Sequence, residues 1–223
     1  SRGLGDVYKR QAAIIGKKEF MGLTLKVNEQ VLIPRPDTET WLEKVIQYYR
    51  NETGLKVADL GTGSGAILVG FLYYCRDAVG VGVDISTEAL KIAEENGQNL
   101  KITDRVEWRQ GDYLKAFDEE DIFDGIFSNP PYIPTKDIGG LSREVKHEPR
   151  LALDGGTDGL YFYHLLAKGA AEHLKPGGFL AVEFGIGQAT DILEMFRKSA
   201  QYEDFEVIKD YGGIERALYC RKK

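Results

Sequence analysis

The sequence predicts an α/β fold with a doubly wound, mostly parallel sheet, and three observations support this. From residue 56 onward, short apolar stretches that end in polar or glycine-rich loops alternate with stretches of helical periodicity. The last two apolar stretches are joined by a glycine pair, as in a hairpin. Hydrophobic residues make up 43% of the 223 residues, which is enough for a sheet covered by helices on both faces.

The predicted strands of this sheet are seven short runs rich in apolar residues. Five of them precede the final hairpin, at residues 56–60, 78–85, 105–112, 121–128 and 179–184. The hairpin comprises residues 205–210 and 215–220, and we expect it to add an antiparallel strand at one edge of the sheet.

Helical periodicity predicts five helices, at residues 35–50, 66–75, 86–100, 160–174 and 187–200. In the first helix the apolar face comprises Trp41, Leu42, Val45, Ile46 and Tyr49. Asp37 or Thr40 is expected to cap this helix, since Thr40 and Glu43 have the spacing of a capping box. The fourth helix is expected to stop at the Lys-Pro-Gly-Gly stretch of residues 175–178.

A smaller β-hairpin is predicted ahead of the first helix. Residues 21–34 alternate apolar and polar side chains around Asn28 and Glu29, which we interpret as the turn. We therefore divide the chain into a tail or linker at 1–17, a hairpin and helix at 18–54, and the main domain at 55–223. Whether the first 11 residues are native to the protein stays open, because they show no periodicity.

Composition and charge exclude several functional classes. The net charge of −6 argues against an extended surface for binding nucleic acid, because such surfaces need clustered Lys and Arg. No run approaches the roughly 18 apolar residues that span a bilayer, so no membrane segment is predicted. Cys75 and Cys220 have no metal-ligand spacing, and no metal site is expected. We expect a cytoplasmic protein whose two thiols are buried and reduced.

A glycine-rich loop, Asp59 to Ala66, follows the first strand of the main domain and opens a helix. Gly61, Gly63 and Gly65 would let the backbone approach a ligand closely, although a tight turn alone would also explain them. Asp84 closes the next strand, where a carboxylate can accept from ribose hydroxyls or simply cap a helix. The pattern favours an adenosine-type cofactor. The G-x-G-x-G spacing lacks the pyrophosphate fingerprint and favours a ligand without phosphates.

Two further positions follow the third strand. Asp112 is a candidate acceptor for an adenine amine, and Tyr113 could lie against the adenine ring or serve as packing surface.

The stretch Asn129-Pro130-Pro131-Tyr132 ends the fourth strand. An amide or aromatic amine is a poor nucleophile because its lone pair is delocalised. Two acceptors, the Asn129 side-chain oxygen and the Pro130 carbonyl, would grip its two N–H bonds and favour positive charge on nitrogen. The prolines stiffen both acceptors, and Tyr132 can stack on a flat group. The alternative interpretation is a rigid loop without chemistry.

Other noticeable residues have ordinary interpretations. Arg35, between two prolines, either lines a substrate entrance or forms a structural ion pair. Arg150 belongs to a stretch that we expect to shape the loop after residue 132, although it could also meet an acidic partner. Residues 161–163, Tyr-Phe-Tyr, open a helix and are interpreted as core. The three histidines show no ligand spacing.

Several of these stretches together resemble a known family. "DLGTGSG", "VGVDIS", "GDYL" and "SNPPYI" resemble class I S-adenosylmethionine-dependent methyltransferases that modify planar amino groups. "LIPRPDTE" (32–39), "NPPYIP" (129–134) and "EPRLALDGGTDGL" (148–160) resemble the HemK/PrmC family more narrowly. That family comprises the protein-(glutamine-N(5)) methyltransferases of peptide chain release factors, which act in translation termination.

The resemblance implies a seven-stranded, Rossmann-like methyltransferase sheet and S-adenosylmethionine as cofactor. The implied cofactor-binding residues are Gly61, Thr62, Gly63, Ser64, Gly65, Asp84 and Tyr113, and we add Asp112 and Asn129 as expected cofactor contacts. The implied catalytic residues are Asn129, Pro130 and Tyr132, and the substrate-binding residues are Asn129, Pro130, Pro131 and Tyr132. The family usually has Trp where this chain has Tyr113.

The resemblance also implies a partner. The expected substrate is the glutamine of the Gly-Gly-Gln loop of a release factor. Independently of the resemblance, nothing in the sequence demands more than a monomer, and the acidic charge predicts no direct contact to nucleic acid. Members of the family usually begin with a helical domain that helps to grip the release factor. Only about 20 residues precede the predicted hairpin here, so we expect the catalysis to be kept and the docking to be affected.

Three other functions remain as alternatives. A methyltransferase for the exocyclic amine of a nucleobase in DNA or RNA shares the Asn-Pro-Pro-Tyr stretch, but would need a basic face. A non-catalytic adenosine-binding module and a nicotinamide-dependent dehydrogenase are compatible with the glycine loop alone.

Overall fold

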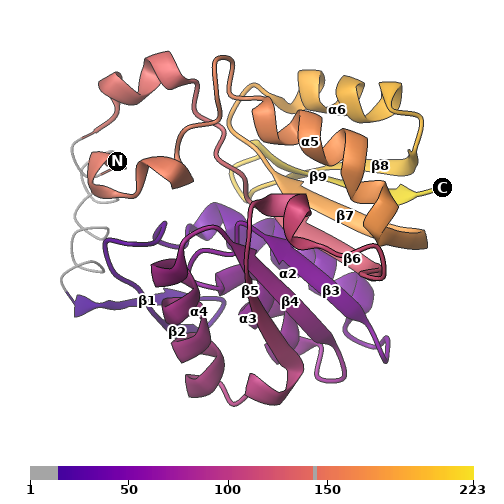
Figure 1. Cartoon of the computed structure of the whole chain (residues 1–223). Coiled ribbons are helices and arrows are strands. Elements are labelled where there is room, and N and C mark those ends of the chain that lie inside the picture. Colours follow the sequence, from indigo (N-terminus) through magenta and orange to yellow (C-terminus); the bar gives the residue numbers. More distant parts are fainter. Residues whose placement is uncertain (1–14, 143–144) are drawn as a thin grey trace.

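The computed structural model describes residues 15–142 and 145–223, which form a seven-stranded sheet with helices on both faces and a separate two-stranded hairpin (Figure 1). The predicted tail at 1–17 lies mostly outside the described residues, and its last residue, Lys17, already begins a strand.

The large sheet contains the seven predicted strands. They are β3 (Lys56–Leu60), β4 (Val79–Asp84), β5 (Val106–Gln110), β6 (Phe123–Ser128), β7 (Leu174–Glu183), β8 (Tyr202–Lys209) and β9 (Glu215–Lys222). Their order is β5-β4-β3-β6-β7-β9-β8, with β9 antiparallel to both of its neighbours and the other pairs parallel. The predicted fold class is therefore confirmed.

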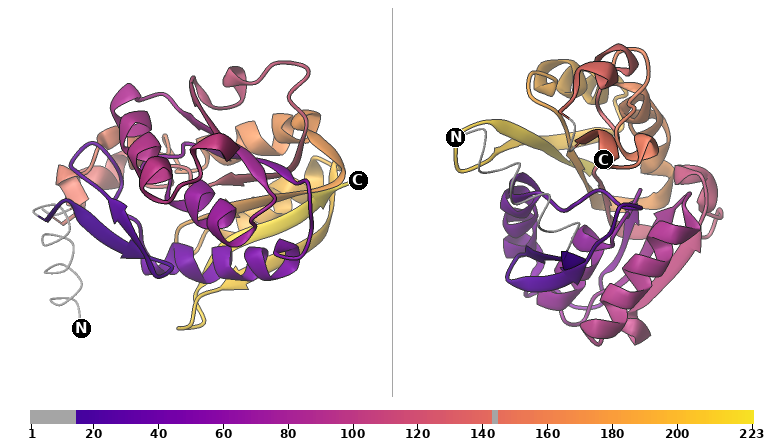
Figure 2. Two further views of the ribbon diagram at one scale, coloured as in Figure 1. Left: turned by 90° about the horizontal axis from the view of Figure 1, so that it is seen from below. Right: turned by 90° about the vertical axis from the view of Figure 1, so that its left-hand side faces the viewer.

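Among the elements that the structure describes in full, five α-helices flank the sheet, at the predicted places. They are α2 (Pro36–Tyr49), α3 (Ala66–Tyr74), α4 (Thr87–Asn99), α5 (Tyr161–Gly169) and α6 (Ala189–Lys198). Short 3-10 turns connect the elements: η1 (Thr103–Arg105), η2 (Tyr113–Ala116), η3 (Thr135–Gly140), η4 (Val145–His147), η5 (Arg150–Ala152) and η6 (Ala170–His173). In Figures 1 and 2, α2, α3 and α4 lie on one side of the sheet and α5 and α6 on the other.

Alternating side chains of the central strands fill two separate cores. Val57 and Phe127 join the core under α2 and α3, whereas their neighbours Ala58 and Ile126 join the core under α5 and α6. This follows from the two-residue period of a strand, which sends successive side chains to opposite faces. The central strands are buried on both faces, which is why they appear in the sequence as continuous apolar runs.

Two local predictions about the segment before the main domain are wrong in position. The hairpin consists of β1 (Lys17–Phe20) and β2 (Leu23–Lys26), and residues 27–35 contain no strand. Its turn is formed by Met21 and Gly22, both with positive φ of 51° and 73°, as a two-residue hairpin turn requires. The alternation of polar and apolar residues continues past the hairpin because Val27, Val31 and Ile33 are buried in a small cluster.

The start of α2 also differs from the prediction. The residue before the first turn is Arg35, and no side chain caps the helix there. Pro36 occupies the first turn, where its missing N–H would have had no partner anyway. The predicted capping box therefore does not form, and the Thr40 hydroxyl donates to the Asp37 carbonyl oxygen instead. The predicted apolar face of α2 is buried.

A third local correction concerns the stretch predicted to stop the fourth helix. Residues 175–178 belong to β7, which begins at Leu174. The pairing of β6 with β7 shifts in register between Phe123 and Gly125, so the proline and glycines are accommodated as an irregularity within the strand pair.

Gly125 in β6 gives a test of the packing between β6 and β7. A Cβ on Gly125 would lie 2.1 Å from the ring of Phe179, which is fully buried. We expect Gly125→Ala to lower the free energy of unfolding by about 3 kcal/mol, because the ring is enclosed by the core. Thermal denaturation should show a decrease of roughly 10 °C. Gly139→Ala, where nothing lies within 4 Å, is the matched control, and an equal effect of both changes would contradict this packing.

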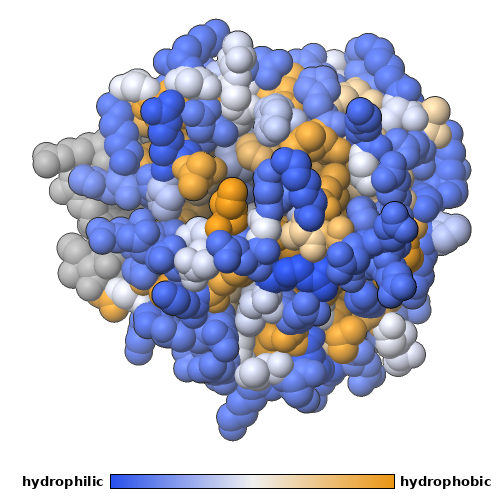
Figure 3. Space-filling model, in the orientation of Figure 1, coloured by the Kyte–Doolittle hydropathy of each residue, from blue (hydrophilic) through white to orange (hydrophobic). Residues whose placement is uncertain are grey.

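The face of the molecule in Figure 3 is mostly hydrophilic, with small apolar patches near its centre. Within the described ranges, no helix combines the length and the apolar character that crossing a membrane requires. Cys75 and Cys220 are both buried and unpaired with each other.

Candidate active site

The predicted functional residues lie at the carboxyl ends of β3, β4, β5 and β6. β3 pairs with β4 on one side and with β6 on the other, so the chain order reverses between β3 and β6. Ligands bind at such reversals in open α/β sheets. A cavity of about 350 Å³, here called the glycine-loop cavity, is found there. A second cavity of about 340 Å³, called the Arg35 cavity, lies next to it and shares Leu32, Asn129 and Ala152.

The loop after β3 is held in place by β4. Gly61, Gly63 and Gly65 all have positive φ, at 71°, 56° and 78°, which side chains with a Cβ rarely adopt. The N–H groups of Gly61 and Thr62 both donate to the Val83 carbonyl oxygen at 2.9 Å. A Cβ on Gly63 would meet nothing within 4 Å, so this glycine faces open space. The loop is therefore fixed before any ligand arrives.

Not every residue predicted to bind the cofactor lines the glycine-loop cavity. The residues that do are Gly61, Gly63, Asp84, Asp112, Tyr113 and Asn129. Thr62 and Ser64 are buried and do not line it. The Thr62 hydroxyl donates to Asp59, and Ser64 offers its carbonyl oxygen to Asn96. Gly65 lies instead against Trp108 and Ala93, where a Cβ would come within 3.1 Å of either side chain.

Asp84 connects the glycine loop to the start of α4. One carboxylate oxygen accepts from Gly63 N at 2.8 Å and the other from Ser86 N at 2.9 Å. The helix cap is Ser86, whose hydroxyl oxygen accepts from Ala89 N, so Asp84 is not the cap. Burial raises the pKa of the Asp84 carboxyl, and the two N–H donors oppose that rise. Each oxygen keeps a lone pair for a ligand in the cavity.

Tyr113 and Asp112 differ in their surroundings. Tyr113 is buried with a positive φ of 55°, and its hydroxyl is 2.5 Å from the Ser128 hydroxyl. Its ring lies 4.8 Å from that of Phe162. Tyr113 therefore both packs in the core and lines the glycine-loop cavity. The Asp112 side chain is half-exposed and pairs with Lys115 at 2.5 Å.

Asn129 lies at the junction of the two cavities. Its side-chain oxygen is buried and has no hydrogen-bond partner among the described residues. Pro131 lines the glycine-loop cavity and Tyr132 lines the Arg35 cavity, whereas Pro130 is buried and lines neither. Burial raises the pKa of the Tyr132 hydroxyl to about 12, so this group stays neutral near pH 7. The site therefore offers a neutral acceptor, not a base.

The segment 148–160 holds the loop of Asn129 in shape. Ile133 N donates to the Leu153 carbonyl oxygen, and the Ile133 carbonyl oxygen accepts from Gly155 N. A Cβ on Gly155 would lie 2.7 Å from the Pro131 carbonyl oxygen, so the two chains approach too closely for a side chain. Gln188 also donates to the Tyr132 carbonyl oxygen at 3.1 Å. The glycines of this segment therefore serve close backbone packing.

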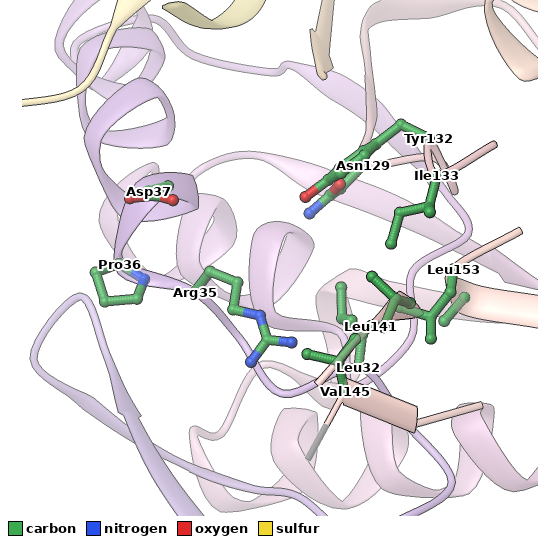
Figure 4. A pocket seen from close by; sticks show the side chains of 11 residues that line it. Leu32, Arg35, Pro36, Asp37, Asn129, Tyr132, Ile133, Leu141, Val145 and Leu153 are labelled. Carbon is green, nitrogen blue, oxygen red and sulfur yellow. The ribbon is translucent and has the colours of Figure 1, made fainter. Parts of the chain in front are cut away.

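The ion pair expected of Arg35 is present in the structure, and a role at a substrate entrance stays a prediction. Its guanidinium pairs with Glu148, and its side chain lines the Arg35 cavity (Figure 4). Arg150 pairs with Asp154 at 3.2 Å on the surface, as expected of a residue that shapes its own loop.

Some cavity residues were missed by the sequence analysis. Tyr161 and Phe162, interpreted as core, line the glycine-loop cavity, and only Tyr163 is fully buried. Val31, from the segment before α2, and Leu151, from the segment before α5, also line it. The sequence offered one indication for Tyr161 and Phe162, because a run of aromatic residues begins two positions after Gly159, at the end of a glycine-rich stretch.

Asp59, at the end of β3, gives a prediction about pH. Burial raises the pKa of its carboxyl from 3.8 to about 7, while the Thr62 hydroxyl opposes this. The folded protein therefore holds this proton more tightly than the unfolded chain, so the contribution of Asp59 to stability falls as pH rises from about 4 to 7. We expect Asp59→Asn to gain stability relative to the original protein over this range, by on the order of 1 kcal/mol per pH unit. Urea denaturation at pH 5 and 7 measures this, and a constant difference would contradict it.

Comparisons with known proteins identify the family to which the chain is similar. Residues 51–210 match a family model described as a methyltransferase domain. The chain is 44% identical over 215 residues to a release factor glutamine methyltransferase of Bradyrhizobium diazoefficiens, covering 95% of this chain and 72% of that protein. It is 41% identical over 210 residues to the protein of the same name from Moorella thermoacetica, covering 94% and 74%.

Solved structures share the fold. A methyltransferase from Pyrococcus furiosus superposes with a TM-score of 0.67 at 21% identity, covering 99% of this chain and 98% of that one. An RNA methyltransferase from Salinibacter ruber in complex with S-adenosyl-L-homocysteine gives a TM-score of 0.53 at 18% identity, covering 85% and 94%. At these identities the likeness concerns the fold alone.

Proposed function

The chain belongs to the release factor glutamine methyltransferases, and on that premise we propose that it methylates the glutamine of the Gly-Gly-Gln loop of a peptide chain release factor. Members of this family are enzymes that use S-adenosylmethionine. The observation that supports the substrate best is the unpartnered oxygen of Asn129, which is buried at the junction of two cavities. One cavity suits the cofactor and the other suits a side-chain amide.

The glycine-loop cavity fits S-adenosylmethionine by its chemistry. The described residues that line it include no cluster of Lys or Arg for phosphates, and the Asp84 carboxylate keeps lone pairs for the two ribose hydroxyls. Ile85 and Phe162 offer apolar surface for the adenine, with Tyr113 beside them and Asp112 as the acceptor for its amine. When bound, the cofactor supplies a methyl group on a positively charged sulfur.

In the proposed mechanism the protein orients a weak nucleophile. The Asn129 oxygen accepts one N–H of the substrate carboxamide, and we assign the other N–H to the carbonyl oxygen of Pro130, a buried residue between Asn129 and Pro131, which line the cavities. These acceptors fix the direction of the nitrogen and stabilise the positive charge that develops on it. Tyr132 flanks the flat amide. No strong base is required, because the alkylated nitrogen loses its proton readily.

The proposal extends to organisation and partners. Residues 55–223 form the cofactor-binding domain, and residues 18–54 lead into it and close the Arg35 cavity with Leu32 and Arg35. The protein partner is a release factor, met in the cytoplasm by a monomeric enzyme. The net charge of −6 speaks against a nucleic acid substrate.

Methyl transfer from radiolabelled S-adenosylmethionine tests this function. A release factor and a Gly-Gly-Gln peptide should both be labelled, and the same peptide with Gly-Gly-Asn should not. DNA and RNA are included as competing substrates. Label on nucleic acid alone would replace the proposal with the nucleobase alternative.

A further inference from the structure

Two residues that line the Arg35 cavity each have a buried polar atom with no partner among residues 15–142 and 145–223. These atoms are Nη1 of Arg35 and Oδ1 of Asn129, and Oε2 of Glu148, the ion-pair partner of Arg35, is unpaired as well. Native proteins leave few buried polar atoms unpaired, because each loses its hydrogen bonds to water. The Asn129 oxygen is explained by the proposed mechanism. The donor on Arg35 is not, and it points to a ligand group that the mechanism has not yet included.

The Arg35 guanidinium is held in one orientation. Arg35 lies between Pro34 and Pro36 with an extended backbone, at φ −101° and ψ 146°. Its Nη2 pairs with Oε1 of Glu148, and the two side chains are only 18% and 6% exposed. The other arm of the fork carries the unpaired Nη1. Figure 4 shows the guanidinium reaching into the cavity toward Leu141 and Val145.

The two ends of the cavity have different neighbours. Asn129 is shared with the glycine-loop cavity, so it marks the inner end, next to the proposed cofactor. Arg35, Leu141 and Val145 line the Arg35 cavity only. In Figure 4, Arg35 lies on the opposite side of the cavity from Tyr132 and Ile133. A glutamine whose amide reaches Asn129 would therefore have its main chain on the side of Arg35.

The charges around Arg35 favour a neutral acceptor. Glu148 already neutralises Arg35, and Asp37, which also lines the cavity, pairs with Arg216 at 3.0 Å. Among the cavity-lining residues that the structure describes, a carboxylate would therefore find no excess positive charge. The oxygen of the reacting carboxamide is also a poor partner, because a cation there would withdraw the nitrogen lone pair that must attack. A main-chain carbonyl oxygen has neither disadvantage.

We propose that Arg35, positioned by Glu148, donates a hydrogen bond from Nη1 to a main-chain carbonyl oxygen of the substrate polypeptide beside the reacting glutamine. This rests on the proposed function. The contact would be equally strong in the ground state and the transition state, so it lowers KM and leaves kcat unchanged.

Steady-state kinetics with a Gly-Gly-Gln peptide tests this role of Arg35. Arg35→Met should raise the peptide KM about 10-fold to 100-fold, as expected for losing a charged hydrogen bond. The kcat and the calorimetric Kd for S-adenosylhomocysteine should stay within about threefold of the original values. Arg35→Lys, which keeps the charge but lacks the fork, should raise KM in the same direction and serves if the first variant is unstable. Arg50→Met, at the exposed far end of α2, should change nothing.

Glu148→Gln tests the positioning. It should raise the peptide KM in the original protein and have no further effect in the Arg35→Met background, because its action passes through Arg35. Additive effects of the two changes would overturn that role. An unchanged KM in both Arg35 variants, with a normal rate in the original protein, would overturn the inference alone. A failure of the original protein to methylate any glutamine peptide would overturn the proposed function instead.

Discussion

Replacing Asn129 with alanine should lower kcat for glutamine methylation about 100-fold or more, which is the cost of removing one preorganised polar contact to a developing charge. The Asn129 oxygen is buried, unpartnered within the described part of the chain and placed between the two cavities. Its hydrogen bond strengthens as the nitrogen becomes positive, so its loss acts on the transition state. Single-turnover methyl transfer to a Gly-Gly-Gln peptide measures the effect without interference from product release.

Affinity for the cofactor separates this role from a structural one. Asn129 is one of many groups that line the glycine-loop cavity, so the Kd for S-adenosylhomocysteine should rise less than about 10-fold in the same variant. Asn51→Ala, the same substitution at an exposed position, is the control. It should leave the rate of methyl transfer and the Kd for S-adenosylhomocysteine unaltered. Undiminished transfer by the Asn129 variant would remove this residue from the mechanism.

Asp84→Ala should weaken binding of S-adenosylmethionine by roughly 100-fold or more, because two hydrogen bonds to a charged acceptor are lost. Asp84 accepts from Gly63 N and Ser86 N, so the change also releases the glycine loop from the end of β4. Both effects lower affinity, and calorimetric titration with S-adenosylhomocysteine measures their sum.

Two further variants separate those effects. Asp84→Asn keeps one acceptor oxygen, which can still accept from Gly63 N or Ser86 N, so it should lose less affinity than Asp84→Ala, about 10-fold. Asp112→Ala, at a half-exposed position that pairs with Lys115, should lose less than either. A larger loss from Asp112 than from Asp84 would mean that the adenine amine, and not the ribose, dominates recognition of the cofactor.

The sequence predicted those residues of the candidate site that lie directly at the end of a strand. Gly61, Asp84 and Asn129 each follow or close a parallel strand, and adjacent parallel strands bring such residues to one edge of a sheet. The glycine spacing also predicted a tightly turned loop whose backbone a ligand can approach, and the positive φ of Gly61, Gly63 and Gly65 agrees with a tight turn. These inferences depend on local backbone geometry, which neighbouring residues determine.

What the sequence could not predict depends on contacts between distant segments. Arg35 and Glu148 are 113 residues apart, and no periodicity relates them. Tyr161 and Phe162 have the composition of core residues, and only the path of segment 148–160 places them at a cavity. The hairpin was misplaced for a different reason, because Val27, Val31 and Ile33 are buried outside any strand and imitate its alternation.

The central claim is that Asn129 holds the reacting glutamine amide between the two cavities. A crystal structure with S-adenosylhomocysteine and a Gly-Gly-Gln peptide tests it directly. We expect the cofactor in the glycine-loop cavity, the glutamine side chain in the Arg35 cavity, and its nitrogen at about 3 Å from the Asn129 oxygen. A glutamine bound elsewhere, or an Asn129 oxygen that contacts only protein groups in that complex, would contradict the account.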